Sequence, residues 1–407
     1  MNSRTLPLAG LRVVDFTWYA AGPYATKALA EHGAEVVKVE TALRVDPLRQ
    51  PSPAPNGEMS TNVSVYNIFN PDKLSITLDL NHDKGPEIAR RLIAKSDVVV
   101  ENFTPDVMAR WGLSYPDLVK VKPDIIMASM PVMGSGGPHS RLGGFGFTIE
   151  SSSGLCSLTG FPGREPVGTG TLYADFSSNP YHTTTAILAA LHYRRLTGLG
   201  QYIELSQVES TICFLGPEVM DYTVNGREQG PVGNRHAYAA PHGAYRCAGD
   251  DRWVAISVWN DGQWQALCAA MGCPPWTTRP EFATHLQRRE HEDELDRLIE
   301  EWTSAHTREE VMFWCQERGI PAGSVQDCED LLLGDAHMRA RGHYVVLDHP
   351  EAGRTVYDGL SYHLSRTPGR VQRYSPLLGE HNDYVYREIL GMSEEEISQC
   401  YVDGVFQ

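Results

Sequence analysis

The 407-residue chain has no cysteine pattern typical of a metal site or a disulfide framework. Its eight cysteines are scattered, without a CxxC pair and without a Cys/His cluster at zinc spacing. The fifteen histidines include no HExxH pair. We therefore expect free thiols, mostly buried, and no bound metal.

Three motifs that bind nucleotides or carry a serine nucleophile are also missing. The first apolar run leads into DFTWYAAGPYATKAL, which has one glycine where a dinucleotide fingerprint needs three. There is no lysine-containing phosphate loop and no GxSxG elbow. We therefore expect no tightly bound cofactor.

Positive charge is scarce: 35 basic residues face 51 acidic ones, for a net charge of -16. Proteins that bind nucleic acid or anionic membranes generally present a basic surface, so neither partner is expected. No apolar run approaches the roughly 20 residues that span a bilayer, and MNSRTLPLAG lacks the apolar core of a secretory signal. The sequence predicts a cytoplasmic protein in which any anionic ligand is met by a local basic site.

Short apolar runs alternate with helical stretches in the first part of the chain. Such alternation predicts βαβ units and a parallel sheet covered on both faces. The fold class is therefore α/β, with a Rossmann-like open sheet. The predicted strands are residues 11–16, 34–40, 75–80, 97–103 and 125–130. The glycine-rich loop 134–144 follows the last of these strands, at the sheet edge where ligands bind in open α/β folds.

The composition shifts towards loop signals near residue 225. We predict a large domain from residues 1–220, completed by 335–407, and a small α+β domain from 225–330. A 3.6-residue apolar period predicts a helix from Pro180 to Thr197, stopped by Gly198.

Asp175 lies between apolar residues immediately before this helix. A carboxylate there either caps the helix or, in a dry site with amide donors nearby, acts as a nucleophile. Spacing alone does not decide between the two.

Ten segments, in one order along the chain, carry a family resemblance. They are LAGLRVVDFT (8–17), AGP (21–23), GAEVVKVE (33–40), NPDKLS (70–75), VENFTPDVMARWGL (100–113), ADFSS (174–178), TGLGQYIELS (197–206), GIPAG (319–323), ARGHY (340–344) and PLLGEHN (376–382). On them the chain resembles the class III CoA-transferases, the family of formyl-CoA and carnitinyl-CoA transferases. The resemblance implies a dimer of interlocked subunits, with acyl-CoA and a carboxylic acid as substrates.

The resemblance also assigns roles to individual residues. It makes Asp175 the catalytic nucleophile, which forms an aspartyl anhydride and then an aspartyl-CoA thioester. The matching CoA-binding positions are Ala20, Ala21, Asn102, Phe103 and Arg110. Arg49 and Lys73 are further candidates, because CoA phosphates need charge-assisted donors within an acidic protein.

Departures from the family pattern concern the substrate side. Much of the family has a carboxylate at Gly146 and a glutamine at Glu150, and the loss at Gly146 suggests room for a larger acyl group. We expect substrate contacts from Phe145, Gly146, Glu150 and Tyr173, and from His236 in a loop that covers the site. The substrate hypothesis is a succinyl-CoA donor with a bulky or aromatic dicarboxylic acceptor such as benzylsuccinate; carnitine-like acids and mesaconate are the alternatives.

Two other functions remain open. An α-methylacyl-CoA racemase resembles this family, but it usually has a histidine in a Gly-His-Asp string, where this chain reads Phe145-Gly146-Phe147. The chain can also be one subunit of a heteromer with a paralogous partner, in place of a homodimer.

Overall fold

The computed structural model describes residues 6–53, 55–62 and 64–407. These form two compact units. The first comprises residues up to 156, 168–228 and 337–407, and the second comprises 157–167 and 229–336. Each is considered by itself below.

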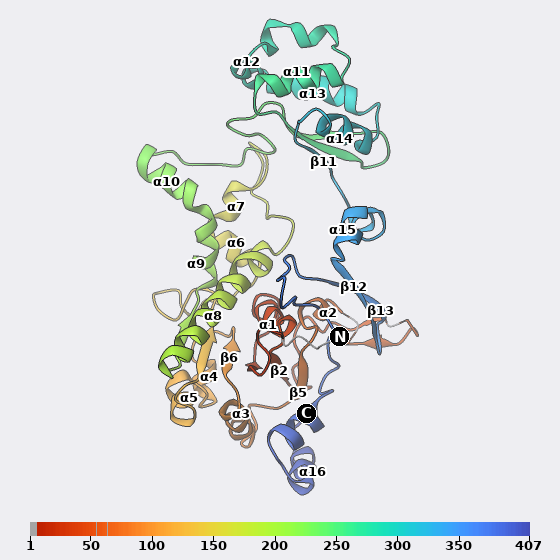
Figure 1. Cartoon of the computed structure of the whole chain (residues 1–407). Coiled ribbons are helices and arrows are strands. Elements are labelled where there is room, and N and C mark those ends of the chain that lie inside the picture. The colour runs from red at the N-terminus through yellow and green to blue at the C-terminus, as the bar shows by residue number, and fades with distance from the viewer. Residues whose placement is uncertain (1–5, 54, 63) are drawn as a thin grey trace. The chain divides into compact units, whose positions relative to one another are not determined.

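The first unit is built on a six-stranded sheet in the order β5-β2-β1-β6-β7-β8, and every neighbouring pair is parallel (Figure 1). Most strand residues are buried because helices cover both faces, which explains the continuous valine-rich runs. The Rossmann-like α/β prediction is confirmed. The strands are β1 (Arg12–Asp15), β2 (Glu35–Glu40), β5 (Leu74–Thr77), β6 (Val98–Glu101), β7 (Ile126–Ser129) and β8 (Tyr202–Glu204).

Two hydrophobic clusters hold the helices against this sheet. Helices α1 (Ala21–Glu31) and α8 (Asn179–Thr197) pack on one face. The other face contacts α3 (Gly85–Ala94), α5 (Tyr115–Val121) and the C-terminal segments η6 (Tyr384–Ile389) and α16 (Glu394–Val402). Helix α8 ends at Gly198 in the left-handed conformation, as the sequence predicts.

The first unit also contains shorter elements around its sheet. They are β3 (Ser52–Pro53), β4 (Met59–Ser60), α2 (Tyr66–Phe69), α4 (Val107–Arg110), α6 (Phe147–Ser153), η1 (Ala174–Ser178), α9 (Gln207–Ile212), η2 (Cys213–Leu215), α10 (Gly216–Asn225), β12 (Tyr344–His349) and β13 (Gly353–Asp358). Helices α7 (Leu155–Leu158) and α15 (Ala336–Arg341) lie at boundaries between the units.

The second unit is a small α+β domain with its own core. An antiparallel sheet in the order β11-β10-β9 packs against helices around Trp264, Leu295 and Val311. Its elements are β9 (His242–Arg246), β10 (Trp253–Ser257), α11 (Asp261–Ala270), η3 (Pro275–Thr278), η4 (Pro280–Phe282), α12 (His285–Glu290), α13 (Glu292–Thr303), α14 (Arg308–Gln316), β11 (Ala322–Ser324) and η5 (Asp330–Gly334).

One boundary differs from the sequence-based division. Residues 157–167, which we assigned to the large domain, group with the second unit. The amide of Gly233 donates a hydrogen bond to the carbonyl of Gly160, which joins two segments distant in sequence. Among the described residues, no helix has both the length and the apolarity needed to cross a membrane.

Candidate active site

Five chain segments meet at the carboxyl edge of the parallel sheet and line a cavity of about 110 Å³. They are the loop after β1, the loop after β6, the glycine-rich loop after β7, the η1 segment before α8 and the start of α9. The lining residues are Trp18, Tyr19, Ala20, Ala21, Asn102, Phe103, Gly144, Phe145, Asp175 and Gln207. The structure thus brings together six of the residues expected from the sequence.

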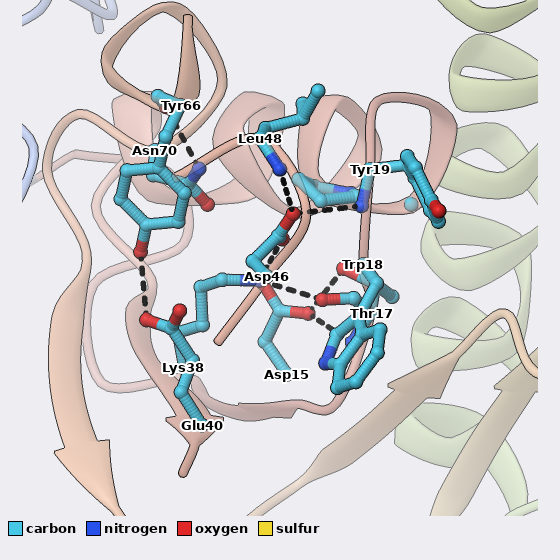
Figure 2. A network of polar contacts seen from close by, with 12 residues as sticks. Asp15, Thr17, Trp18, Tyr19, Lys38, Glu40, Asp46, Leu48, Tyr66 and Asn70 are labelled. Atoms are coloured by element: carbon cyan, nitrogen blue, oxygen red, sulfur yellow. Dashed lines mark hydrogen bonds and ion pairs between the residues drawn. The ribbon is translucent and has the colours of Figure 1, made fainter. Parts of the chain in front are cut away.

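The loop after β1 is fixed by buried polar contacts (Figure 2). Asp15 accepts hydrogen bonds from the amide and the hydroxyl of Thr17. The ammonium of Lys38 donates to the carbonyl of Thr17 at 2.6 Å, and the amide of Tyr19 donates to Asp46 at 3.3 Å. These contacts hold Tyr19 at φ +61°, a left-handed conformation that is uncommon for any residue but glycine.

Asn102, directly after β6, holds the loop that follows β1. Its side-chain oxygen accepts from the amide of Trp18 at 2.8 Å, and its amide group donates to the carbonyl of Trp18 at 2.8 Å. Glu101, one residue earlier, accepts from the amide of Phe103 at 2.8 Å. The ENF string at residues 101–103 therefore positions backbone around the cavity.

Asp175 lies in η1, immediately before α8, and only 3% of its surface is exposed. No side chain caps η1 or α8 through a hydrogen bond, so the capping interpretation of Asp175 has no support in this geometry. Burial, followed by the charge of Glu150, raises the pKa of Asp175 to about 7. The backbone amide of Gly146 interacts with the carboxylate and acts in the opposite direction.

Glu150 is buried in α6, and it accepts hydrogen bonds from the segment just before Asp175. Its carboxylate accepts hydrogen bonds from the amide of Tyr173 at 2.9 Å and from the hydroxyl of Thr169 at 3.1 Å. The ring of Tyr173 packs against Phe214 with centroids 5.7 Å apart. Glu150 therefore organises the turn before Asp175 and adds a second negative charge near it.

Extra room at Gly146 for a larger acyl group stays a prediction, although the Leu172 side chain lies where a Cβ of residue 146 would be. A Cβ at Gly146 would lie 2.4 Å from Leu172 and 3.3 Å from the carboxylate of Asp175. The space that a larger side chain would need is thus already filled. Gly146 lets the backbone approach the Asp175 carboxylate, and its φ of +37° suits glycine.

A larger hollow of about 820 Å³ shares Trp18 and Phe103 with the Asp175 cavity. Arg110, at the end of α4, lines it and is exposed. Arg44 also lines it, with its guanidinium 5.0 Å from the ring centre of Trp18. Within the described ranges, neither arginine has a carboxylate at ion-pair distance, so both charges are available to an anion.

Arg49 and Lys73 correct the sequence-based set of phosphate-binding residues. Arg49 is buried and donates two hydrogen bonds to the Glu40 carboxylate, at 2.8 and 2.9 Å. Lys73 is buried and donates to Asp15 at 3.0 Å. Both positive charges are neutralised inside the protein, so neither is kept as a candidate phosphate ligand.

His236 belongs to the second unit, whereas the Asp175 cavity belongs to the first. Its ring lies 5.3 Å from that of His242 and 4.9 Å from that of Trp259. A substrate contact from His236 stays a prediction.

Several lining residues escaped the sequence-based selection, among them Gln207, Tyr19 and Arg44. Gln207, at the start of α9, is buried and donates to the carbonyl of Met130 at 2.6 Å. No sequence signal marks it, because its neighbours belong to a distant strand. Tyr19 and Arg44 carried weak signals: both follow strands whose carboxyl ends reach the ligand-binding edge.

Known proteins resemble the chain over nearly its whole length. The model of CoA-transferase family III matches residues 8–382. The alpha subunit of a succinyl-CoA–L-malate CoA-transferase from Chloroflexus aurantiacus is 35% identical over 97% of this chain and 91% of that subunit. A succinate–glutarate CoA-transferase from Agrobacterium fabrum is 32% identical over 96% of this chain and 97% of its own.

A solved structure agrees with the fold described above. The crystal structure of a CAIB/BAIF family protein from Brucella suis superimposes with a TM-score of 0.86 at 30% identity, covering 95% of this chain and 100% of that one. The family model, the curated relatives and this fold lead to one conclusion: the chain belongs to CoA-transferase family III.

Proposed function

We propose that the chain transfers CoA from succinyl-CoA to a small dicarboxylic acid, with Asp175 as the nucleophile. The observation that carries this proposal is the burial of Asp175 at a small, partly open cavity that shares Trp18 and Phe103 with the larger, arginine-lined hollow. In the proposed complex, the hollow takes the nucleotide part of CoA and the cavity takes the thioester. Arg44 and Arg110 would then meet phosphates.

The Asp175 carboxylate attacks the donor thioester carbonyl, and the C–S bond breaks to give an aspartyl anhydride and CoA thiolate. The thiolate attacks the aspartyl carbonyl, which releases the donor acid and leaves an aspartyl-CoA thioester. The acceptor carboxylate displaces the thiolate again, and the thiolate then attacks the acceptor carbonyl. The new acyl-CoA leaves, and Asp175 is regenerated without net proton transfer.

In this proposal, backbone amides at the cavity stabilise the negative charge of each tetrahedral intermediate. Helix α1 begins at the cavity with Ala20 and Ala21, and no side chain caps its first amides. The amide of Gly146 already interacts with Asp175. Uncapped amides at a helix N-terminus favour negative charge, and amide donors of this kind typically lower acyl-transfer barriers by about 3–4 kcal/mol.

The choice of substrates rests on the relatives. Those named above act on succinyl-CoA with L-malate and on succinate with glutarate, and a 32%-identical relative is named for succinyl-CoA and D-citramalate. The filled space at Gly146 favours small acceptors over benzylsuccinate. Transfer rates from succinyl-CoA to malate, citramalate, glutarate, mesaconate, carnitine and benzylsuccinate test the assignment; a preference for benzylsuccinate would reverse it.

Trapping tests the nucleophile directly. Hydroxylamine added to enzyme preincubated with succinyl-CoA should inactivate it and label Asp175, because both covalent intermediates carry an activated aspartyl carbonyl. The isosteric Asp175→Asn variant should neither transfer CoA nor be labelled. Transfer by this variant at the wild-type rate would exclude the mechanism.

Racemase activity is less well supported by the site. Besides Asp175, the candidate second acid or base is Glu150, and its carboxylate already accepts hydrogen bonds from Tyr173 and Thr169. Incubation with one stereopure 2-methylacyl-CoA and no acceptor acid tests this alternative. Epimerisation without CoA exchange would favour the racemase.

We also propose that the active protein is an assembly of at least two chains. Helix α10 has no buried residue, although it carries Val219, Met220, Tyr222 and Val224. Such an apolar helix face is typical of a subunit interface. Relatives named as alpha and beta subunits match at equal identity, so the partner is a second copy or a paralogue. Light scattering of the purified chain and co-purification from its source distinguish these cases.

A further inference from the structure

Two aromatic rings face each other at the Asp175 cavity. Tyr19 and Phe145 stack with ring centroids 5.2 Å apart and an interplanar angle of 11°. Both residues line the cavity, yet 36% of Tyr19 and 56% of Phe145 remain exposed. The pair therefore lies between the buried carboxylate and solvent.

The Tyr19 ring is held in place by its backbone. Its φ of +61° disfavours a residue with a Cβ, and such strain persists only where the surroundings impose it. Figure 2 shows those surroundings: Asp46 accepts from the amide of Tyr19, and Lys38 bonds to both Thr17 and Asp46. A buried charged network thus fixes the position of one exposed ring.

Phe145 has the opposite backbone setting. It lies between Gly144 and Gly146, in a loop without helix or strand that ends where α6 begins. Glycines on both sides allow the Phe145 backbone more conformations than other residues would. One ring therefore sits on a backbone held by buried charges, and its partner is flanked by two glycines.

The proposed reaction passes through an aspartyl anhydride that water can hydrolyse. Water that attacks the aspartyl anhydride breaks a C–O bond and gives two carboxylates, the released acid and Asp175. Of the two protons that water supplies, one is taken up by the CoA thiolate and the other is lost to solvent. The net result is hydrolysis of acyl-CoA to acid and CoA, which destroys the thioester. Exclusion of water from the closed site prevents this side reaction.

We propose that the Tyr19–Phe145 ring pair closes the cavity over the covalent intermediates: Tyr19 is the fixed half and Phe145 the half that opens for the acyl group. This inference rests on the proposed transferase function. It gives both residues a role in choosing transfer over hydrolysis, separate from the chemistry of Asp175.

The test is the ratio of hydrolysis to transfer, measured as free CoA and product acyl-CoA from succinyl-CoA with and without acceptor. Tyr19→Gly removes the ring and suits the φ of +61°, so lost shielding is separated from backbone strain. Phe145→Ala removes the other ring. Since a stacked aromatic pair contributes modestly, the expected rise in the ratio is about fivefold to tenfold for either variant.

Matched controls keep the outcome specific. Tyr19→Phe retains the ring and should keep the wild-type ratio. Tyr202→Ala breaks another partly exposed ring pair, Tyr115–Tyr202 with centroids 5.6 Å apart, and should also keep it. Asp175→Asn should lose hydrolysis and transfer together.

The outcomes separate the two levels of the proposal. A wild-type ratio in both Tyr19→Gly and Phe145→Ala would overturn the ring-pair inference and leave the transferase intact. Equal loss of transfer and hydrolysis, with no change in the ratio, would mean a structural role and would also overturn it. Continued transfer by Asp175→Asn would instead refute the proposed function. If Tyr19→Gly fails to fold, Phe145→Ala decides the question.

Discussion

Replacing Glu150 with glutamine should move the acidic limb of the pH–rate profile to lower pH. The substitution keeps the size of the side chain and an oxygen that can accept from Tyr173, but it removes the negative charge that helps to raise the pKa of Asp175. Burial, the larger cause, remains. We expect the pKa of Asp175 to fall from about 7 to about 6, since a neighbouring carboxylate typically raises a pKa by one unit or more.

The magnitude follows from the fraction of Asp175 that is ionised. At pH 6, a carboxyl with a pKa of about 7 is about one-tenth ionised, whereas one with a pKa of about 6 is half ionised. Glu150→Gln should therefore raise kcat/KM at pH 6 by about fivefold. At pH 8 both enzymes are ionised, and the variant should show no gain because a less basic carboxylate is a slightly weaker nucleophile.

The assay is CoA transfer from succinyl-CoA between pH 5.5 and 8.5, with product thioesters quantified by chromatography. Two other buried carboxyls, Glu31 and Glu101, also have pKa values raised to about 7, mainly by burial. Glu31→Gln and Glu101→Gln are therefore the controls, and neither should move the limb. A limb that stays in place in Glu150→Gln, or moves to higher pH, would refute the reasoning.

Four further substitutions test the site and the buried charges around it. Asp175→Asn should raise the Tm at pH 8 by several degrees and less at pH 5. When folding raises the pKa of a carboxyl from 3.8 to about 7, the folded protein loses stability as the pH increases through that range, by at most about 4 kcal/mol. Equal Tm values for the wild type and the variant at pH 8 would contradict the raised pKa. Arg110→Ala and Arg44→Ala should each raise KM for succinyl-CoA about tenfold at low salt, with kcat nearly unchanged, because each variant loses a charge-assisted phosphate contact. An unchanged KM would remove that arginine from the proposed site. Arg49→Met should lower the free energy of unfolding by about 3–5 kcal/mol in denaturant titrations, because it leaves Glu40 buried without its partner, and a KM effect without loss of stability would restore Arg49 as a ligand.

Local patterns predicted the elements of the fold well. The apolar runs at 11–16, 34–40 and 97–103 became β1, β2 and β6, because strands covered on both faces must be continuously apolar. The C-terminal helix starts at Ser393, whose hydroxyl accepts from the amide of Glu396 in a capping box. Such signals depend on interactions within a few residues, so they can be recognised without knowledge of the tertiary contacts.

The charged residues show where sequence reasoning stopped. Arg44 and Arg49 both follow β2, whereas Lys73 and Arg110 lie within motif segments. Burial against Glu40 and Asp15 neutralises Arg49 and Lys73, whereas Arg44 and Arg110 stay exposed on the larger hollow. The folded arrangement of these side chains, and not the position of a basic residue in the sequence, decides which charges stay exposed.

The sequence by itself determined the parallel α/β architecture, the order of motifs that indicates a class III CoA-transferase, and the position of Asp175 before a helix. The tertiary structure alone decided which side chains surround that carboxylate: five separate segments meet at one sheet edge. It also decided that Gly146 brings backbone close to Asp175, that Glu150 shares its charge environment, and that Tyr19 and Phe145 stack at the cavity. The physical reason is that burial and charge proximity depend on distances between segments, which no local pattern contains.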